Sequence, residues 1–157
     1  MPELELVRAT TDDIEVLAEL HLALNREMVR YARCYPEETL VPHNIAYLIR
    51  SIMEREQFLA WLALANGTPV GFVSVTLHGS PIPGSERLTG RIANLYVVPS
   101  VRRQGVGRAL AQHAISALRA VGAAHVELQF LIQNQAAARF WAGLGFVAES
   151  ITAILPS

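Results

Sequence analysis

The stretch from Asn94 to Ala109 constrains the fold more than any other part of the chain. An apolar strand ends at Val98, a proline turn follows, and a basic loop with two glycines leads into a helix. Gly105 and Gly107 let backbone N–H groups come close to a ligand. The helix adds unpaired N–H donors and the positive end of its dipole. The stretch therefore predicts a phosphate or pyrophosphate site directly beside a strand.

Two well-known phosphate-binding loops fit this stretch badly. A Walker loop requires a lysine after its glycines, and the chain contains no lysine. A dinucleotide-binding fingerprint requires Gly-x-Gly-x-x-Gly/Ala directly after a strand, but here the third position is Leu110 and the segment Pro99–Gln104 intervenes. A nucleotide- or dinucleotide-binding domain is therefore a disfavoured alternative, although Glu127 has the spacing of a ribose-binding acid.

The stretch instead resembles the central motif of the GCN5-related N-acetyltransferase (GNAT) family, Arg/Gln-x-x-Gly-x-Gly/Ala. Arg102, Gly105 and Gly107 occupy its three fixed positions. A second signature of the family is similar to the later segment Asn134-x-x-Ala137-x-x-Phe140-Trp141-x-x-x-Gly145-Phe146. Because the two signatures occur in the family's order and spacing, the resemblance is specific, and it covers essentially the whole chain.

Hydrophobic periodicity and turn residues predict a single α/β domain over residues 1–157. The predicted strands are Leu4–Val7, Phe58–Ala65, Val70–Leu77, Ile92–Val98, Val126–Leu131 and Phe146–Leu155. Four helices are predicted. The first begins with an Asp12/Glu15 capping box and runs to about Arg30, and the second follows Pro42 and carries an apolar stripe from Ile45 to Met53. The third is Gly107–Val121, and the fourth is capped by Asn134 and ended by Gly145. The resemblance implies a mixed, mostly antiparallel sheet flanked by helices, with a cofactor cleft between the fourth and fifth strands.

Composition indicates a compact enzyme domain in the cytoplasm. Hydrophobic residues make up 52% of the 157 residues, and the net charge of −1 argues against nucleic acid or a membrane surface as partner. Glu3 and Glu5 interrupt any signal peptide, and no apolar run is long enough to span a bilayer. The single cysteine, Cys34, excludes an internal disulfide and fits a reducing compartment. No metal site is expected.

The resemblance implies acetyl-CoA as cofactor and gives roles to particular residues. Backbone N–H groups from Gln104 to Ala109, Val106 included, would hold the pyrophosphate, with charge from Arg102, Arg103 or Arg108. The main chain of Leu95, Tyr96, Val97 and Val98 would pair with the pantetheine arm, and the Val97 N–H would polarise the acetyl carbonyl. Asn134 would bind the far side of the arm, and Trp141 would pack beside its sulfur end.

The chain departs from the family at the acid and the base. Trp141 stands where a tyrosine often protonates the leaving thiolate, and Arg91 stands where some members have a glutamate base. Tyr96 is then the best remaining catalytic phenol, and ordered water is an alternative route for the proton. His21 lies on the apolar stripe of the first helix, which favours a core histidine with satisfied hydrogen bonds.

The predicted acceptor pocket lies near the end of the first helix. Tyr31, Tyr35 and His78 are its candidate substrate-binding residues, beside Met28 and the loop that His78 begins. Four acidic side chains near this pocket have two interpretations: they would attract a cationic amine, or they are ordinary surface carboxylates. They are Glu27, Glu37, Glu38 and Glu86.

The function implied is direct transfer of an acetyl group from acetyl-CoA to a primary amine of an unidentified small molecule or peptide. An acyl-CoA-binding module of the same fold with little or no turnover is the alternative, because the usual acid and base are missing. A homodimer is expected from the habits of the family and from the apolar last strand, Phe146–Leu155, which could pair at an edge.

Overall fold

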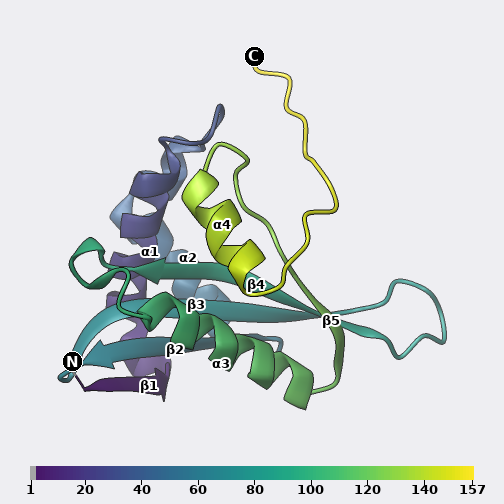
Figure 1. Ribbon diagram of the computed structural model, residues 1–157, viewed down its shortest axis with the longest axis horizontal. Helices are drawn as coiled ribbons and strands as arrows, with labels where there is room; N and C mark the ends of the chain where they lie inside the picture. The colour runs from purple at the N-terminus through teal and green to yellow at the C-terminus, as the bar shows by residue number, and fades with distance from the viewer. Residues whose placement is uncertain (1–2) are drawn as a thin grey trace.

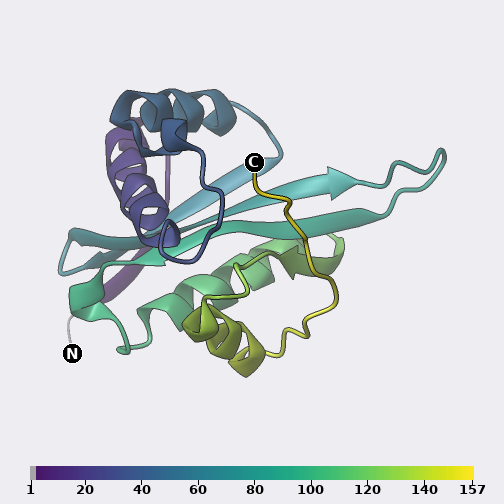
Figure 2. The ribbon, with the colours of Figure 1, turned by 90° about the horizontal axis from the view of Figure 1, so that it is seen from above.

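Five strands form one mixed sheet, and helices cover both of its faces (Figures 1 and 2). The computed structural model describes residues 3–157. The strands are β1 Leu4–Arg8, β2 Phe58–Ala65, β3 Thr68–Gly79, β4 Leu88–Val97 and β5 Ala123–Leu128; the helices are α1 Ile14–Met28, α2 Pro42–Met53, α3 Val106–Ala120 and α4 Gln135–Gly143. Strands β1 to β4 pair antiparallel in chain order, and β5 pairs parallel with β4. The predicted fold class is confirmed.

The sheet separates two hydrophobic cores because side chains alternate between its faces along each strand. Phe72 and Tyr96 belong to the core under α1 and α2, whereas their neighbours Val73 and Val97 belong to the core under α3. In Figure 2 the pair α1 and α2 lies on one side of the sheet, and α3 and α4 lie on the other. The two helix layers therefore hold the central strands β3 and β4 from both sides.

Strand β4 changes its pairing near its middle. Ser74 of β3 pairs with Asn94, but Val75 pairs with Ile92, so Ala93 is an extra residue that forms a β-bulge. On the other edge of β4, the pairing with β5 ends at Ile92 opposite Leu128. The second half of β4 therefore has β3 on one side and no strand on the other.

The prediction of a last strand over Phe146–Leu155 is wrong for this structure. Residues 146–157 contain no regular element, and they run away from the sheet as an extended segment (Figure 1). Val147, Ile151 and Leu155 are 88%, 80% and 96% exposed. The apolar character of the segment favours a strand, but a strand forms only where a neighbouring backbone accepts and donates the hydrogen bonds, and no strand among residues 3–157 is paired with it.

Several predicted boundaries move by a few residues. The capping box uses Thr10 and Asp13 rather than Asp12 and Glu15, since the Thr10 hydroxyl accepts from the Asp12 N–H and the Asp13 carboxylate accepts from the Thr10 N–H. Helix α1 ends at Met28, two residues before the predicted end. Strand β4 begins at Leu88 rather than Ile92, and β5 covers Ala123–Leu128 rather than Val126–Leu131. Asn134 caps α4 as predicted, with its side-chain oxygen accepting from the Ala137 N–H.

None of the helices described in residues 3–157 is both long and apolar enough to cross a membrane.

The contact between β3 and β4 gives a test of the packing. A Cβ added at Gly71 would lie 2.6 Å from the Tyr96 carbonyl oxygen, whereas a Cβ at Gly79, in the same strand, meets nothing within 4 Å. We expect Gly71→Ala to lower the free energy of unfolding by about 1–3 kcal/mol, because backbone atoms must shift to remove the clash. Gly79→Ala, measured in the same urea titration, is the control and should be close to neutral. Equal stability of the two variants would contradict this packing.

Candidate active site

A cleft opens where β4 and β5 separate. Its cavity of about 160 Å³ lies between the second half of β4, the segment after β5, the end of α1 and α4. The residues used below that line it are Asn25, Met28, Tyr35, Leu95, Asn134 and Trp141. The cleft thus brings together four segments that are far apart in the sequence.

The open edge of β4 presents main-chain groups to this cleft. In an antiparallel ladder, residues whose N–H and C=O groups face one neighbour alternate with residues that face the other side. The Val98 N–H donates to the Val70 carbonyl at 2.8 Å, so Val98 faces β3, and Tyr96, two residues earlier, faces β3 as well. The backbone groups of Leu95 and Val97 therefore point to the edge that β5 has left. Two of the four residues predicted to pair with the pantetheine arm have their backbone groups on this edge.

The loop between β4 and α3 presents backbone N–H donors. Within residues 3–157, the N–H groups from Arg103 to Arg108 have no acceptor, whereas the Ala109 N–H donates to the Gly105 carbonyl at 3.0 Å and closes the first turn of α3. Gly105 has φ +86° and Arg103 has φ +63°, both in the left-handed region. Successive N–H groups in such a loop at a helix N-terminus form a concave anion site.

Arg102 is engaged within the protein. Its Nε donates to the Val97 carbonyl at 2.7 Å, and its two terminal nitrogens donate to the two carboxylate oxygens of Glu27 at 2.7 and 2.8 Å. The guanidinium also lies 5.4 Å from the centre of the Tyr96 ring. This bidentate pair ties the end of α1 to the end of β4. The carboxylate of Glu27, predicted to attract an amine, is thus already paired with a cation.

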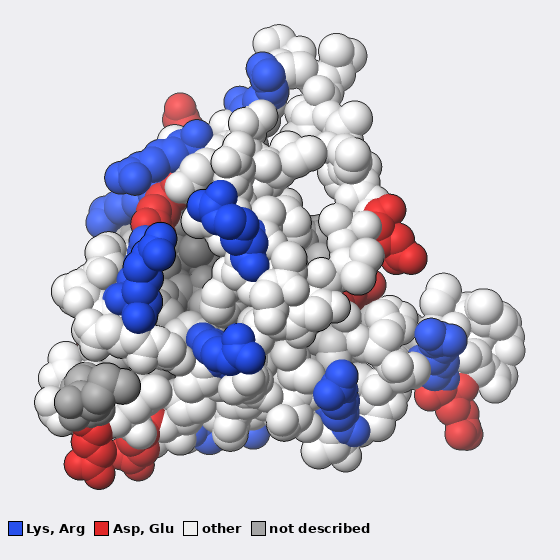
Figure 3. Space-filling view, in the orientation of Figure 1, with Lys and Arg blue, Asp and Glu red and all other residues white. Residues whose placement is uncertain are grey.

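The other two arginines of the loop are differently placed. Arg103 and Arg108 are exposed and form no ion pair within the described residues. Figure 3 shows arginine side chains around a hollow between α4 and the loop that leads into α3. The charge that is free to meet an anion at this loop therefore comes from Arg103 and Arg108.

Aromatic packing forms the wall of the cleft on the α4 side. Trp141 is buried, and its ring packs edge-on against Phe140 and Phe146 at centroid distances of 4.8 and 5.4 Å. Asn134 lines the same wall at the start of α4. Both residues therefore line the cleft that also contains the open edge of β4.

A hydrogen-bonded pair forms the opposite wall. The Tyr35 hydroxyl donates to Asn25 Oδ1 at 2.9 Å, and Asn25 Nδ2 donates to the Thr39 carbonyl at 2.9 Å. Burial raises the pKa of Tyr35, so its phenol is protonated at neutral pH. Sequence reasoning found Tyr35 but missed Asn25, whose only signal is a polar residue beside the apolar stripe of α1.

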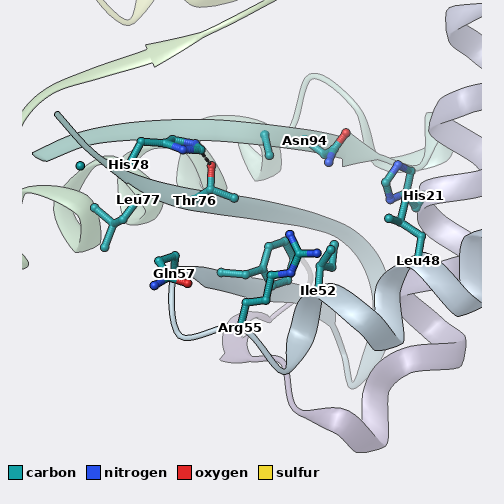
Figure 4. Close-up of a pocket in the computed structure, with 12 residues that line it drawn as sticks. His21, Leu48, Ile52, Arg55, Gln57, Thr76, Leu77, His78 and Asn94 are labelled. Carbon is teal, nitrogen blue, oxygen red and sulfur yellow. Dashed lines mark hydrogen bonds between the residues drawn. The ribbon is translucent and has the colours of Figure 1, made fainter. Parts of the chain in front are cut away.

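A second cavity, of about 480 Å³, lies on the α2 side of the sheet (Figure 4). It lies between α1, α2, the loop after α2, β3 and β4; residues used below that line it are His21, Leu48, Ile52, Arg55, His78 and Asn94. Ala93 and Asn94 line both this cavity and the cleft. Both spaces therefore border the β4 bulge.

His21 lines the wall of this second cavity. Its side chain is buried, with 8% exposed, and Nδ1 has no hydrogen-bond partner among the described residues. Burial lowers the pKa of His21, so the imidazole is neutral at pH 7. The prediction of a satisfied histidine is therefore wrong, since the side chain carries an orphaned ring nitrogen beside a cavity.

The remaining predicted acceptor and catalytic residues divide into two groups. His78 lines the second cavity, where its Nε2 lies 2.8 Å from the Thr76 hydroxyl. Tyr31 and Tyr96 line neither of these two spaces. Tyr96 is buried instead against Arg102, and its pKa is raised by burial and then by Glu27.

Four charged side chains discussed above also lie outside the two spaces. Glu37, Glu38 and Glu86 line neither cavity. Arg91, at the position of the family's occasional glutamate base, donates to Glu127 of β5 at 2.7 Å. This pair holds β4 and β5 together just before they separate.

The described residues contain no group of three or more His, Cys, Asp or Glu side chains that could hold a metal ion.

Comparison with known proteins agrees with this arrangement. A curated, uncharacterized N-acetyltransferase of Methanocaldococcus jannaschii is 28% identical over 143 residues, which are 90% of this chain and 60% of that protein. The chain thus spans about three fifths of the length of that relative.

Solved structures share the fold. A GCN5-related N-acetyltransferase from Ralstonia eutropha has a TM-score of 0.79 at 21% identity, over 98% of this chain and 99% of that chain. An aminoglycoside N-acetyltransferase in complex with CoA has a TM-score of 0.76 at 14% identity, over 100% of this chain and 96% of that chain.

The model of the acetyltransferase (GNAT) family matches residues 20–146, which include the loop before α3, the cleft and α4. The chain therefore belongs to the GNAT acetyltransferase family, whose members are N-acetyltransferases that use acetyl-CoA.

Proposed function

We propose that this protein transfers an acetyl group from acetyl-CoA directly to a primary amine. The observation that carries the proposal is that two spaces border the β4 bulge, where Ala93 and Asn94 line both. One space is the cleft on the unpaired edge of β4, the strand that leads into the loop with free N–H donors, and the other is a separate cavity of about 480 Å³. Two reactants held in these spaces would have their reacting groups side by side, which is the main requirement for direct transfer.

The cofactor would bind along the open edge of β4. Its pyrophosphate would accept hydrogen bonds from the backbone N–H groups of the loop between Arg103 and Arg108, with charge from those two arginines. The pantetheine arm would pair with Leu95 and Val97 as an added strand, with Asn134 and Trp141 on its other side. Arg102 would support this edge through the Val97 carbonyl rather than bind phosphate.

The reaction would take place beside the bulge. The amine nitrogen attacks the thioester carbonyl carbon, the carbonyl oxygen gains negative charge, and the C–S bond then breaks. A backbone N–H aimed at that oxygen stabilises the charge. The sequence predicts Val97 for this role, but Leu95 is the first residue after the bulge whose N–H points into the cleft, so the geometry favours Leu95 for the oxygen and Val97 for the arm.

The catalytic role of Tyr96 stays a prediction, and Tyr35 is a second candidate. Tyr35 lines the cleft with a protonated phenol, whereas the Tyr96 ring is buried beside Arg102. A protonated phenol can donate a proton but cannot accept one, so whichever tyrosine reaches the departing thiolate would act as the acid. The amine would lose its proton to ordered water or to a neutral imidazole.

A CoA-binding module without turnover is the alternative, and the observation that favours it is the buried Trp141 in the place of a tyrosine. Release of free thiol from acetyl-CoA in the presence of a panel of primary amines distinguishes the two. Binding without amine-dependent thiol release would establish the module.

We expect acetyl-CoA to raise the melting temperature while NAD and ATP leave it unchanged, because only a ligand held by the folded state shifts unfolding.

Gly105→Val should weaken acetyl-CoA binding about 10-fold or more, since a side chain at φ +86° would distort the loop and its N–H donors. Gly84→Val is the matched control, because Gly84 has φ +79° in open space and lines neither cavity. Normal binding to the Gly105 variant, or equal stabilisation by ATP, would count against the loop assignment.

We expect Trp141 to act by packing rather than by proton transfer, because an indole N–H is too weak an acid. Trp141→Phe should raise the KM for acetyl-CoA by about 3- to 10-fold and keep most of the kcat, and Trp141→Tyr should keep or raise the kcat. Trp61→Phe, which replaces a buried tryptophan that lines neither cavity, controls for general loss of stability. Loss of turnover in Trp141→Phe at saturating acetyl-CoA, with binding intact, would refute the packing role.

We also propose a homodimer formed through residues 146–155. This segment is mostly apolar, exposes Val147, Ile151 and Leu155, and pairs with no strand among residues 3–157. A second copy offers the backbone partner that a strand requires.

Light scattering at micromolar concentration should give twice the mass of one chain. The double variant Ile151→Asp/Leu155→Asp should give the mass of one chain, whereas Glu149→Gln, in the same segment, should remain a dimer. A monomeric parent protein would rule out the dimer.

A further inference from the structure

The second cavity has an unusual charge for a site that would receive an amine. Arg55 is the one lining residue with a full positive charge, and no Asp or Glu lines the cavity within residues 3–157. His21 is neutral, and His78 is engaged with the Thr76 hydroxyl. An acceptor that enters this cavity therefore meets a cation and no carboxylate.

Hydrogen bonds fix the backbone of Arg55, whereas its guanidinium has no ion-pair partner within the described residues. Its N–H donates to the Ile52 carbonyl at 3.0 Å, and its carbonyl accepts from the Phe58 N–H at 3.1 Å, which fixes the turn between α2 and β2. The side chain extends from this turn into the cavity (Figure 4). Glu54 and Glu56 flank it in the chain, but neither lines the cavity, and Arg55 forms no ion pair within the described residues.

The rest of the cavity combines apolar walls with a polar end. Leu48, Ile52, Phe58 and Leu77 form apolar lining. Asn94 lies at the bulge, where its Nδ2 donates to the Ser74 hydroxyl at 3.3 Å. A cavity of this volume and lining has ample room for a small molecule with an apolar body.

We propose that the acceptor is an apolar amino acid or a close analogue, whose carboxylate pairs with Arg55, whose side chain packs on α2, and whose amine reaches the bulge. This assignment rests on the proposed acetyltransferase function. A single guanidinium balances the single charge of a carboxylate and matches its two oxygens. The new N–C bond forms as the C–S bond breaks, the nitrogen loses one proton to water or an imidazole while the thiolate gains one from a phenol or water, and the products are the N-acetyl amino acid and CoA.

The test compares three acceptors with the same apolar body: leucine, leucinamide and 3-methylbutylamine. Thiol release with acetyl-CoA at constant pH should give a kcat/KM for leucine about 10- to 100-fold above the other two. This preference is expected although the ammonium of leucinamide loses its proton more readily than that of leucine. Equal or lower kcat/KM for leucine would overturn the assignment.

Variants of Arg55 tie the preference to this residue. Arg55→Gln should lower the kcat/KM for leucine by about 10- to 100-fold and leave that for leucinamide unchanged, and Arg55→Lys should recover part of the loss. Arg50→Gln is the matched control, because Arg50 is an exposed arginine of α2 that does not line the cavity. A leucine preference that survives Arg55→Gln would overturn the role of Arg55.

A binding measurement separates this proposal from the proposed function. N-acetyl-leucine should raise the melting temperature of the CoA-loaded protein more than N-acetyl-leucinamide does, and Arg55→Gln should abolish the difference. Turnover of leucinamide and 3-methylbutylamine without a preference for leucine would leave the acetyltransferase function intact and refute only the acceptor. Absence of thiol release with all three, while other primary amines of the panel are acetylated, would also refute only the acceptor. Absence of amine-dependent thiol release with the whole panel would refute the proposed function, and the acceptor with it.

Discussion

The end of hydrogen bonding between β4 and β5 at Ile92 and Leu128 is the constraint on which the site depends. Beyond that point the backbone groups of Leu95 and Val97 face a cleft instead of a strand, and buried backbone groups are costly when they lack partners. The Arg91–Glu127 ion pair lies just before the separation and holds the two strands together there. A sheet that is closed at one end and open at the other thus leaves a strand edge unpaired in its interior, where a ligand could pair with it.

The bulge at Ala93 determines what this edge can do. The bulge inserts one residue between Ile92 and Asn94. Ile92 is the last residue of β4 that pairs with β5, so the unpaired backbone groups of β4 begin directly after it. It also brings Ala93 and Asn94 into contact with both cavities. The bulge is therefore the part of the sheet that borders both spaces.

Local signals in the sequence were sufficient for much of the fold. Glycines and N-caps act within a few residues, so the loop around Gly105 and the Asn134 cap were predictable, and so was the order of the first five strands. The features that were missed arise from distant pairing. The bulge depends on the register between two strands, Arg102 meets Glu27 across 75 positions, and the segment 146–155 has the pattern of a strand without a partner in its own chain.

An open strand edge is usually a hazard, because it can pair with the edge of another protein and start aggregation. In this structure Arg102 occupies the Val97 carbonyl, and the end of α1 and α4 stand on either side of the edge. Beyond Ile92, β4 is therefore flanked by helices rather than free along its length. Covering an edge with helices is one of the ways in which proteins prevent pairing with another sheet, so the walls that shape the cleft also protect the protein from aggregation through this edge.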